Sequence, residues 1–474
     1  MPEITKTPKT SHPSADSTRA LAVDPVWAWA PYEPDPRQPW DMRRAGHLYR
    51  RAGFGAAWNE LQRALADGPQ RTIDRLLHPG HQAEAFNRAH DEYELSAIDP
   101  AAASSDTLRQ WWLRRMLETP HPLLEKMTLF WHQHFATAGA RVHNARLMQR
   151  YLQLLRSHGL GRLVPLMVAV TRDPATLLSL DVGANYRSRP SENLARALLE
   201  HFTVGPGAFT GQDVREAARA FTGWSVLTRQ LRYLEHQHDS GVKTILGQQG
   251  NWSGEDAVRI ALQHPATAPR LVRKLYRWFI SEADEPGEAL IAPLAQLLAK
   301  DGDIGKLVET MLRSNLFFSP IAYRRRIKSP VEFALSIVRP FETLVPTAPL
   351  GHALNRLGQD LCEPPTLDGW EGGQTWITSA TLLERHNLAV ALLGGGEPFG
   401  DKLDPSALAE KHGHHSAESA GRFFVDLFLQ GDLEDAVREK LLKGAGTRPA
   451  SPPSAARYRQ MAQAIVTLPE FQLA

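Results

Sequence analysis

Residues 210–224 read TGQDVREAARAFTGW and contain a whole helix with a signal at each end. Thr210 and Asp213 have the spacing of a capping box, in which each side chain accepts a hydrogen bond from the other residue's backbone N–H. Apolar residues then recur at helical spacing until Gly223, which is suited to ending a helix. The stretch predicts one amphipathic helix, with Trp224 in the core where the chain turns back.

Helical periodicity of the same kind recurs along the chain, at 106–117, 257–262, 268–280, 290–298 and 304–312. Strand-like alternation is rare, and its best candidate runs over 231–238, followed by Ser240-Gly241 and then 244–246. We therefore predict a mainly α fold. It would be one large helical unit with at most a small β-hairpin at about 231–246 and a loop rich in Trp, Gly and Pro.

The ends of the chain differ in composition from its middle. Residues 1–25 are rich in Ser, Thr and Pro, which predicts a disordered tail. Residues 26–40 carry Trp and Pro and predict an extended arm whose tryptophans dock on the body. The helical unit would span 41–474, with a linker at about 444–455 before a short C-terminal helix.

Composition excludes several classes of protein. The 474 residues include 54 Lys and Arg against 52 Asp and Glu, a formal net charge of +2, so we expect neither a nucleic-acid nor a membrane partner. Cys362 is the sole cysteine, and any metal site must therefore use His, Asp and Glu. No stretch approaches ~18 consecutive apolar residues, and the N-terminal segment lacks an export signal. These features predict a soluble, cytoplasmic protein.

The first candidate for chemistry is FWHQHF at 130–135. On a helix His134 lies within the apolar stripe, whereas His132 points about 160° away from it, so the pair cannot chelate one ion. His134 is either a buried histidine that donates to a backbone carbonyl or an inward-facing functional group.

The second candidate is the polar face of the helix SENLARALLE at 191–200, with Ser191 as its N-cap. Glu192, Asn193, Arg196 and Glu200 share one arc of the helix. Either they form a solvated face with i, i+4 ion pairs, or they line a cleft in which a glutamate is a base or ligand.

The third candidate is a metal site around His236 and His238. At the end of a strand these two side chains would point to the same side, with Asp239 beyond them. His132 is a further candidate ligand. A divalent metal held by His and carboxylates is one interpretation of this pattern, and a polar hairpin tip is the other.

The fourth candidate is the loop EPPTLDGWEGGQTW at 363–376. Trp370 and Trp376 would stack on a sugar or another ring, or else plug the core. Before it, the basic run at 324–328 ends in Lys328, which is a candidate anion ligand. The phosphate-binding, nucleophile-elbow and zincin patterns GxxxxGK[ST], GxSxG and HExxH do not occur.

Taken in order, these segments resemble the bacterial family called domain of unknown function 1800, over about residues 41–474. The resemblance rests on HLYRRAGFG (47–55), FWHQHF (130–135), ENLAR (192–196), DVREAARAFTGW (213–224), HD (238–239) with KTILG (243–247), HPATA (264–268), RIKSPVE (326–332) and the loop from Pro364 to Trp376. It implies a mainly helical single unit without an established activity. It also implies a partner, a phosphatase- or sulfatase-related protein encoded nearby.

Two features depart from the family's pattern. Many members carry an export signal, which is not seen here. In the family a Glu directly follows the Arg of ENLAR, whereas this chain has Ala197. If that Glu is catalytic in other members of the family, this chain lacks the catalytic carboxylate.

Two functions follow from these candidates. The first is a hydrolase acting on a polar substrate, such as a carbohydrate, in a pocket between the helices of His134 and Glu200 under the Trp370 loop. A glutamate or histidine would be the acid or base, and Arg196 or Lys328 would hold an anion. The second is a non-catalytic scaffold or partner-binding protein whose polar residues form a structural network.

Overall fold

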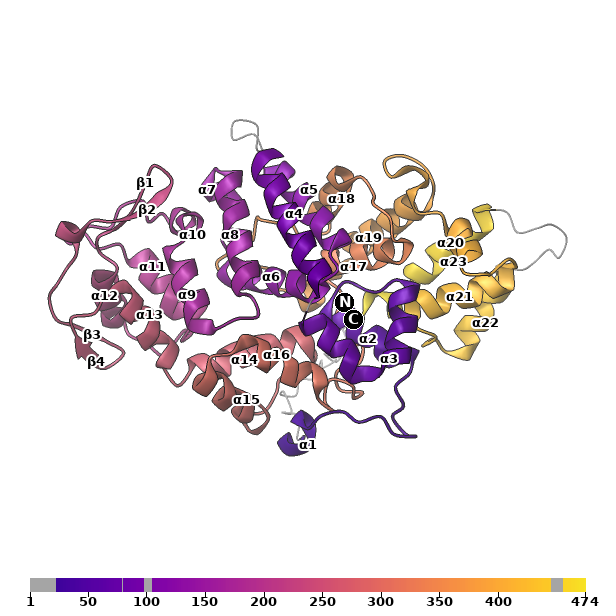
Figure 1. The fold of residues 1–474 in the computed structure, drawn as a ribbon, viewed down its shortest axis with the longest axis horizontal. Coiled ribbons are helices and arrows are strands. Elements are labelled where there is room, and N and C mark those ends of the chain that lie inside the picture. The colour runs from indigo at the N-terminus through magenta and orange to yellow at the C-terminus, as the bar shows by residue number, and fades with distance from the viewer. Residues whose placement is uncertain (1–22, 79, 98–104, 445–454) are drawn as a thin grey trace, which may run out of the picture.

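The computed structural model describes residues 23–474 except 79, 98–104 and 445–454 (Figure 1). The first half of the chain is helical. Its helices are α1 (Pro25–Trp29), α2 (Met42–Ala52), α3 (Trp58–Leu77), α4 (His81–Ala97), α5 (Ser105–Glu118), α6 (Pro122–Phe135), α7 (Gly139–Val142), α8 (Ala145–His158), α9 (Leu163–Arg172), α10 (Pro174–Ser179), α11 (Glu192–Arg196) and α12 (Gly211–Ala220).

Four short strands follow, β1 (Trp224–Leu227), β2 (Gln230–Tyr233), β3 (Lys243–Ile245) and β4 (Gln248–Gly250). The remaining helices are α13 (Gly254–Gln263), α14 (Thr267–Phe279), α15 (Glu288–Asp301), α16 (Ile304–Arg313), α17 (Pro330–Val338), α18 (Thr347–Arg356), α19 (Ser379–Leu393), α20 (Pro405–Lys411), α21 (Ala417–Leu429), α22 (Asp435–Gly444) and α23 (Ala455–Val466). The prediction of a mainly α unit is confirmed.

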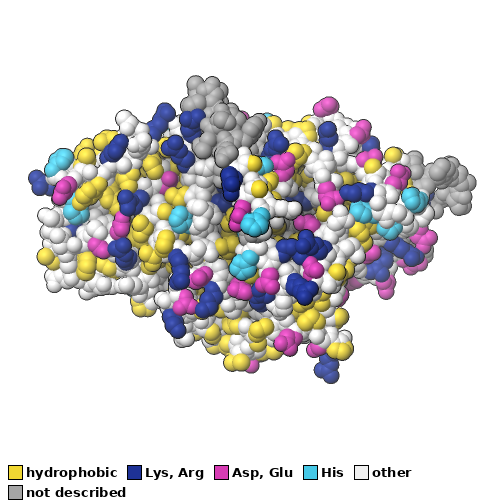
Figure 2. All heavy atoms as spheres, viewed as in Figure 1, with side chains coloured by type: hydrophobic (Ala, Val, Ile, Leu, Met, Phe, Trp, Pro, Cys, Tyr) yellow, Lys and Arg dark blue, Asp and Glu magenta, His cyan; other side chains and the backbone are white. Residues whose placement is uncertain are grey.

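The molecule is elongated, and α6 runs through its middle (Figure 1). The strands and α12 lie at one end, and α20 to α23 lie at the other. Figure 2 shows Lys and Arg interspersed with Asp and Glu over one face, as the balanced composition leads one to expect. Among the described residues, no helix combines the length and the apolar character that crossing a membrane requires.

The helix α12 begins as its sequence predicts. The Thr210 side chain accepts a hydrogen bond from Asp213 N, and the Asp213 carboxylate accepts one from Thr210 N at 2.9 Å. Gly223 has φ +88°, a left-handed conformation that glycine adopts without strain. The chain therefore turns sharply, and Trp224 is buried with 7% exposure. Its predicted core position is confirmed.

The predicted strand pairing is wrong. Residues 231–238 do not pair with 244–246; instead β1 pairs with β2, and β3 pairs with β4, in two separate antiparallel hairpins. The two-residue turns explain the error, because Thr228 and Arg229 both have positive φ, as do Leu246 and Gly247. Residues other than Gly, Asn and Asp rarely adopt this conformation, so Thr228, Arg229 and Leu246 carry no usual turn signal.

The arm before α2 is helical at its start, because α1 (Pro25–Trp29) is capped by Asp24, whose side chain accepts a hydrogen bond from Val26 N at 3.0 Å. Further along, Trp29 Nε1 donates to Leu290 O at 2.7 Å, and Trp40 Nε1 donates to Ala64 O at 2.9 Å. Both tryptophans thus attach the arm to the body as predicted, whereas Trp27 is exposed and the prediction is wrong for it. Residues 1–22 of the predicted tail, and the predicted linker between α22 and α23, lie outside the described residues.

The interior around α6 contains ion pairs. Glu125 accepts from Arg115 Nε at 2.8 Å and from Arg156 Nε at 2.5 Å, and all three side chains are buried. One residue later, Lys126 pairs with Glu332 of α17. Because buried charges are costly unless they are paired, these contacts fix α6 against α5, α8 and α17.

Candidate functional site

A cavity of about 260 Å³ opens between α6, α14 and the loop at 366–376. Its walls combine aromatic rings with groups of both charges. The lining residues are Phe130, Gln133, His134, Lys274, Arg277, Trp278, Glu282, Arg326, Ser329, Asp368, Trp370, Glu371, Gly372, Gly373 and Trp376. Such a mixture is typical of a site for a polar ligand with flat apolar faces.

The loop at 366–376 is held directly on α6. Gln133 Nε2 donates to the carbonyl oxygen of Trp370 at 2.9 Å. Gly369 has φ +79°, and a Cβ at this position would lie 2.3 Å from Gln133 O, so no larger residue fits. Trp376 follows in a short 3₁₀ turn and is buried. This close approach places Trp370 and Trp376 in the wall of the cavity.

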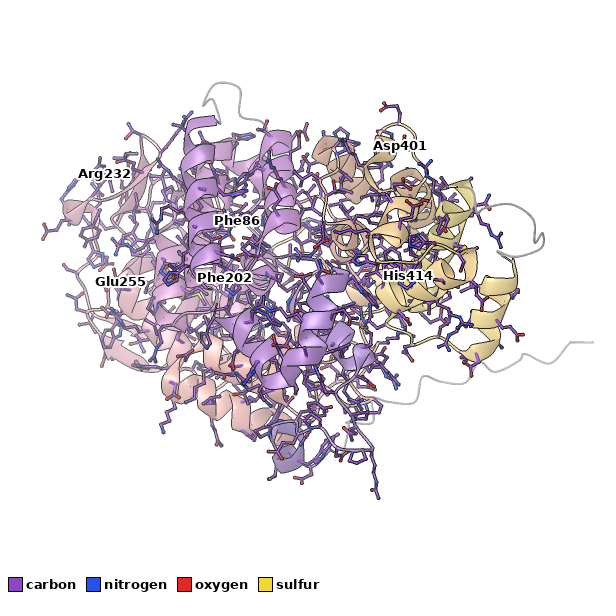
Figure 3. All side chains as sticks on the ribbon, turned by 45° about the vertical axis from the view of Figure 1, so that its right-hand side comes forward. Phe86, Phe202, Arg232, Glu255, Asp401 and His414 are labelled. Atoms are coloured by element: carbon purple, nitrogen blue, oxygen red, sulfur yellow. The ribbon has the colours of Figure 1, made fainter. Side chains whose placement is uncertain are left out.

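His134 connects α6 with α14. Its Nε2 lies 3.1 Å from the carbonyl oxygen of Phe202, which is labelled in Figure 3, and its Nδ1 lies 3.0 Å from Lys274 Nζ. Because a carbonyl oxygen only accepts, the imidazole carries its proton on Nε2 and accepts from the ammonium at Nδ1. Burial, and then the charge of Lys274, keep the pKa of His134 well below its usual value. His134 is therefore a neutral histidine.

Lys274 is a cavity-lining cation with a lowered pKa. Burial, and then the positive charge of Arg270, lower the pKa of its ammonium to about 8, while Asp368 acts in the opposite direction. No carboxylate of the described residues forms an ion pair with Lys274, whose nitrogen donates to His134. An ammonium in this setting attracts an anionic group, and the neutral amine that forms as pH rises through about 8 can act as a base.

Asp368 and His201 form a second polar pair at the edge of the cavity. His201 Nδ1 lies 2.9 Å from Asp368 Oδ1; the Asp368 side chain is 72% exposed and that of His201 15%. Beside them, Arg270 donates to the backbone carbonyl of Glu200. A carboxylate that binds Nδ1–H orients the imidazole and leaves Nε2 as the basic nitrogen.

The wall that contains Glu282 and Arg326 is held by ion pairs. Arg326 Nε donates to Glu282 at 3.1 Å, Arg326 Nη1 donates to Glu332 at 2.9 Å, and the guanidinium lies 4.7 Å from the centre of the Trp278 ring. The backbone N–H of Ile327 also donates to Glu282, at 3.3 Å. Since Glu282 has these two donors, we interpret it as structural rather than as a general acid.

Comparison with known proteins places the chain in a family. Residues 47–473 match the family model described as Protein of unknown function (DUF1800). The chain belongs to this family. No curated protein and no solved structure matches it significantly. The family resemblance inferred from the motifs is thereby confirmed, and it assigns no activity.

Three candidates from the sequence lie in the cavity of this DUF1800 protein, namely His134, Trp370 and Trp376. His134 is buried against a carbonyl, as the structural alternative predicts, and it also lines the cavity. Trp370 and Trp376 likewise are buried and line it. Lys328 is buried elsewhere, with Nζ 3.1 Å from Ser336 Oγ.

The polar helix face does not line the cavity. Glu192 and Arg196 form a surface ion pair at 2.9 Å, and Asn193 Nδ2 donates to Leu180 O at 2.8 Å. The prediction that these residues share one face assumed a regular helix, but α11 passes into a π-helical segment at Ala197–Phe202. The wider π turn changes which residues share a face, and Glu200 is half-buried outside the lining. Glu192 and Arg196 thus match the alternative of a solvated face.

The strand geometry assumed for the metal site is also wrong. Residues Glu235–Gln237 form a 3₁₀ turn in which His236 is exposed, while His238 Nδ1 lies 2.9 Å from Thr222 O. Asp239 is held by Arg219 at 2.7 Å. His132 is buried in α6, with its ring 5.6 Å from Trp370. Within the described ranges, no three His, Cys, Asp or Glu side chains gather closely enough for a metal ion.

Sequence reasoning did not find Lys274, Asp368 and His201. A signal was available for the first, because Arg270 and Lys274 lie four residues apart and therefore on one face of α14. The other two lie 167 residues apart. Only the folded loop brings Asp368 to the π segment that carries His201.

Proposed function

We propose that the cavity binds a small hydroxyl-rich ligand of the carbohydrate class, and that the protein hydrolyses it. One observation supports this best. The Trp370 and Trp376 rings, the Lys274 ammonium and the Asp368 carboxylate face the same cavity of about 260 Å³. The volume is at the small end for ligand sites and suits a single sugar unit.

Each group has a distinct role in this proposal. The tryptophan rings offer flat faces for the C–H side of a sugar. The Lys274 ammonium, which forms an ion pair with no carboxylate of the described residues, stabilises negative charge on the ligand or on the leaving oxygen. His201 acts as the base that takes a proton from water, because Asp368 holds its Nδ1 and leaves Nε2 to accept it.

Binding is tested by calorimetric titration of the whole chain with glucose and with glucuronate. We expect Lys274→Met and Trp376→Ala to weaken binding at least about tenfold. Arg273→Gln is the matched control, because Arg273 lies on the same helix but pairs with Glu288 outside the cavity. If neither sugar binds the wild-type chain, the carbohydrate assignment is wrong.

Hydrolysis is tested separately with a panel of 4-nitrophenyl glycosides and esters. We expect His201→Ala to abolish release of nitrophenol while sugar binding persists, and Asp368→Asn to reduce it in the same way. Unchanged turnover in His201→Ala contradicts the role given to this pair.

A non-catalytic scaffold is the second candidate. It is favoured by the buried ion pairs around Glu125 and Glu332, which tie together helices from distant parts of the chain. A scaffold predicts that no glycoside or ester of the panel is turned over. It also predicts that Lys274→Met changes stability alone.

A further inference from the structure

Five buried cations have no carboxylate within ion-pair distance among the described residues. They are Arg50, Arg51, Lys243, Lys328 and Arg385, with exposures of 6%, 0%, 0%, 2% and 1%. Arg51, Lys243 and Arg385 nevertheless donate to backbone carbonyls, to Ile280 O, Gly241 O and Lys328 O respectively. Fully buried cations are normally paired. Arg50 and Lys328 are therefore the unusual members of this set.

Arg50 and Lys328 each satisfy only part of their hydrogen-bonding capacity. Arg50 Nη1 donates to Gln430 Oε1, but Nε and Nη2 are buried and have no acceptor among the described residues. Lys328 Nζ donates to Ser336 Oγ at 3.1 Å and lies 3.5 Å from the centre of the Phe471 ring. Neither contact supplies a full negative charge.

A third cation, Arg324, is less buried than these two. Arg324 pairs with Asp432 at 3.2 Å, and Arg43 reaches the same carboxylate at 3.7 Å. The guanidinium groups of Arg324 and Arg50 lie 5.6 and 5.5 Å from the centre of the Tyr323 ring. Asp432 thus pairs with the outer arginines, whereas neither Arg50 nor Lys328 forms an ion pair with a carboxylate of the described residues.

Arg50, Arg324 and Lys328 are here called the cation cluster, because Arg50 and Arg324 flank the Tyr323 ring and the charges of both act on Lys328. Burial is the main reason that the pKa of Lys328 lies well below its usual value, and the charge of Arg50 is the next. Arg324 and Arg385 lower the pKa of Lys328 further, against the opposing effect of Glu332. The cluster is therefore short of negative charge.

We propose that the cation cluster binds a tetrahedral oxyanion, phosphate or sulfate. Arginine presents several N–H donors to such oxygens, and lysine adds a compact point charge. The bound anion would accept from Arg50 Nε and Nη2 and would compensate Lys328. The basic run at 324–328 that stands out in the sequence thereby gains a role.

This site is distinct from the cavity described above, since none of its three residues lines that cavity. It lies between four elements: α2, the segment at 323–328, α17 and the end of α21. Arg50 of α2 bonds Gln430, and Lys328 bonds Ser336 of α17. An anion there would tie these elements together and stabilise the fold.

The test is the thermal unfolding of the whole chain in phosphate, in sulfate and in chloride at matched ionic strength. For the wild type we expect a saturable rise in Tm of at least about 1 °C with phosphate or sulfate over chloride. Lys328→Met and Arg50→Met should lose this rise. Lys328→Met is the safer variant, because an apolar side chain suits the neighbouring Phe471 ring.

Two controls separate the cluster from other effects. Arg325→Gln removes one charge from the same run, but Arg325 is exposed, so its phosphate response should equal that of the wild type. Lys274→Met should also keep the full response, and this distinguishes the cation cluster from the cavity. A nonspecific stabilising effect of sulfate, by contrast, would raise the Tm of every variant by the same amount.

A direct measurement completes the test. Calorimetric titration of the wild type with inorganic phosphate should give one site per chain, and Lys328→Met should weaken it at least about tenfold. The proposal is overturned if the wild type shows no anion response, or if Lys328→Met responds as the wild type does. The latter result would mean that Lys328 is a neutral amine in the folded protein.

Discussion

Replacing Glu125 by Gln tests whether ion pairs fix the middle of the molecule. Glu125 is fully buried and accepts from both Arg115 and Arg156, and Trp112 Nε1 donates to its second oxygen at 3.0 Å. Burial opposes its ionisation, but the two arginines outweigh burial and lower the pKa from 4.5 to about 2. The folded state therefore holds the carboxylate in its charged form.

The size of the effect follows from that pKa. At 1.36 kcal/mol per pKa unit, a fall from 4.5 to about 2 corresponds to about 3 kcal/mol in favour of the folded, ionised state. Removing one partner of a buried ion pair costs about 3–5 kcal/mol by independent measurements on proteins. We expect Glu125→Gln to lower the free energy of unfolding by about 3 kcal/mol.

The pH dependence gives a second readout. Because the folded pKa is depressed, the stabilisation is fully present above about pH 4.5 and is lost as pH falls toward about 2. Glutamine resembles the protonated carboxyl, so the difference between wild type and Glu125→Gln should shrink over this range.

Urea-induced unfolding at several pH values measures both quantities. Glu235→Gln is the matched control, because Glu235 is exposed, and it should stay within about 0.5 kcal/mol of the wild type. This reasoning would be refuted if Glu125→Gln lowered the free energy of unfolding by less than about 1 kcal/mol at neutral pH. It would also be refuted if the difference from the wild type did not change with pH.

Three further predictions concern the cavity and the fold. Gly369→Ala should cost more than about 1 kcal/mol in urea unfolding, because the residue has φ +79° and its Cβ would meet Gln133 O; a neutral effect would mean that the loop is not held on α6. Binding of glucuronate should weaken as pH rises through about 8, where the Lys274 ammonium loses its charge, and titrations that are flat from pH 7 to about 9 would exclude this role. Trp224→Ala should lower the free energy of unfolding by about 3–5 kcal/mol, and a chemical denaturation midpoint equal to that of the wild type would contradict its core position.

Local structure could be predicted wherever the signal lies within a few neighbouring residues. The capping box of Thr210 and Asp213 and the turn at Gly223 depend on residues within one helix and its ends, and the structure reproduces them. The motifs were likewise sufficient to recognise the family. Where local signals are weak, prediction failed, as at the turns of Thr228 and Leu246, whose positive φ values are set by the hairpins around them.

The candidate site depended on tertiary structure. The π segment at Ala197–Phe202 carries His201, and only the fold brings it beside Asp368, which lies 167 residues away. Lys274 gained its lowered pKa only because folding buried it next to Arg270 and His134. Burial and electrostatic fields arise from the packing of distant segments, and helical periodicity gives no information about which segments those are.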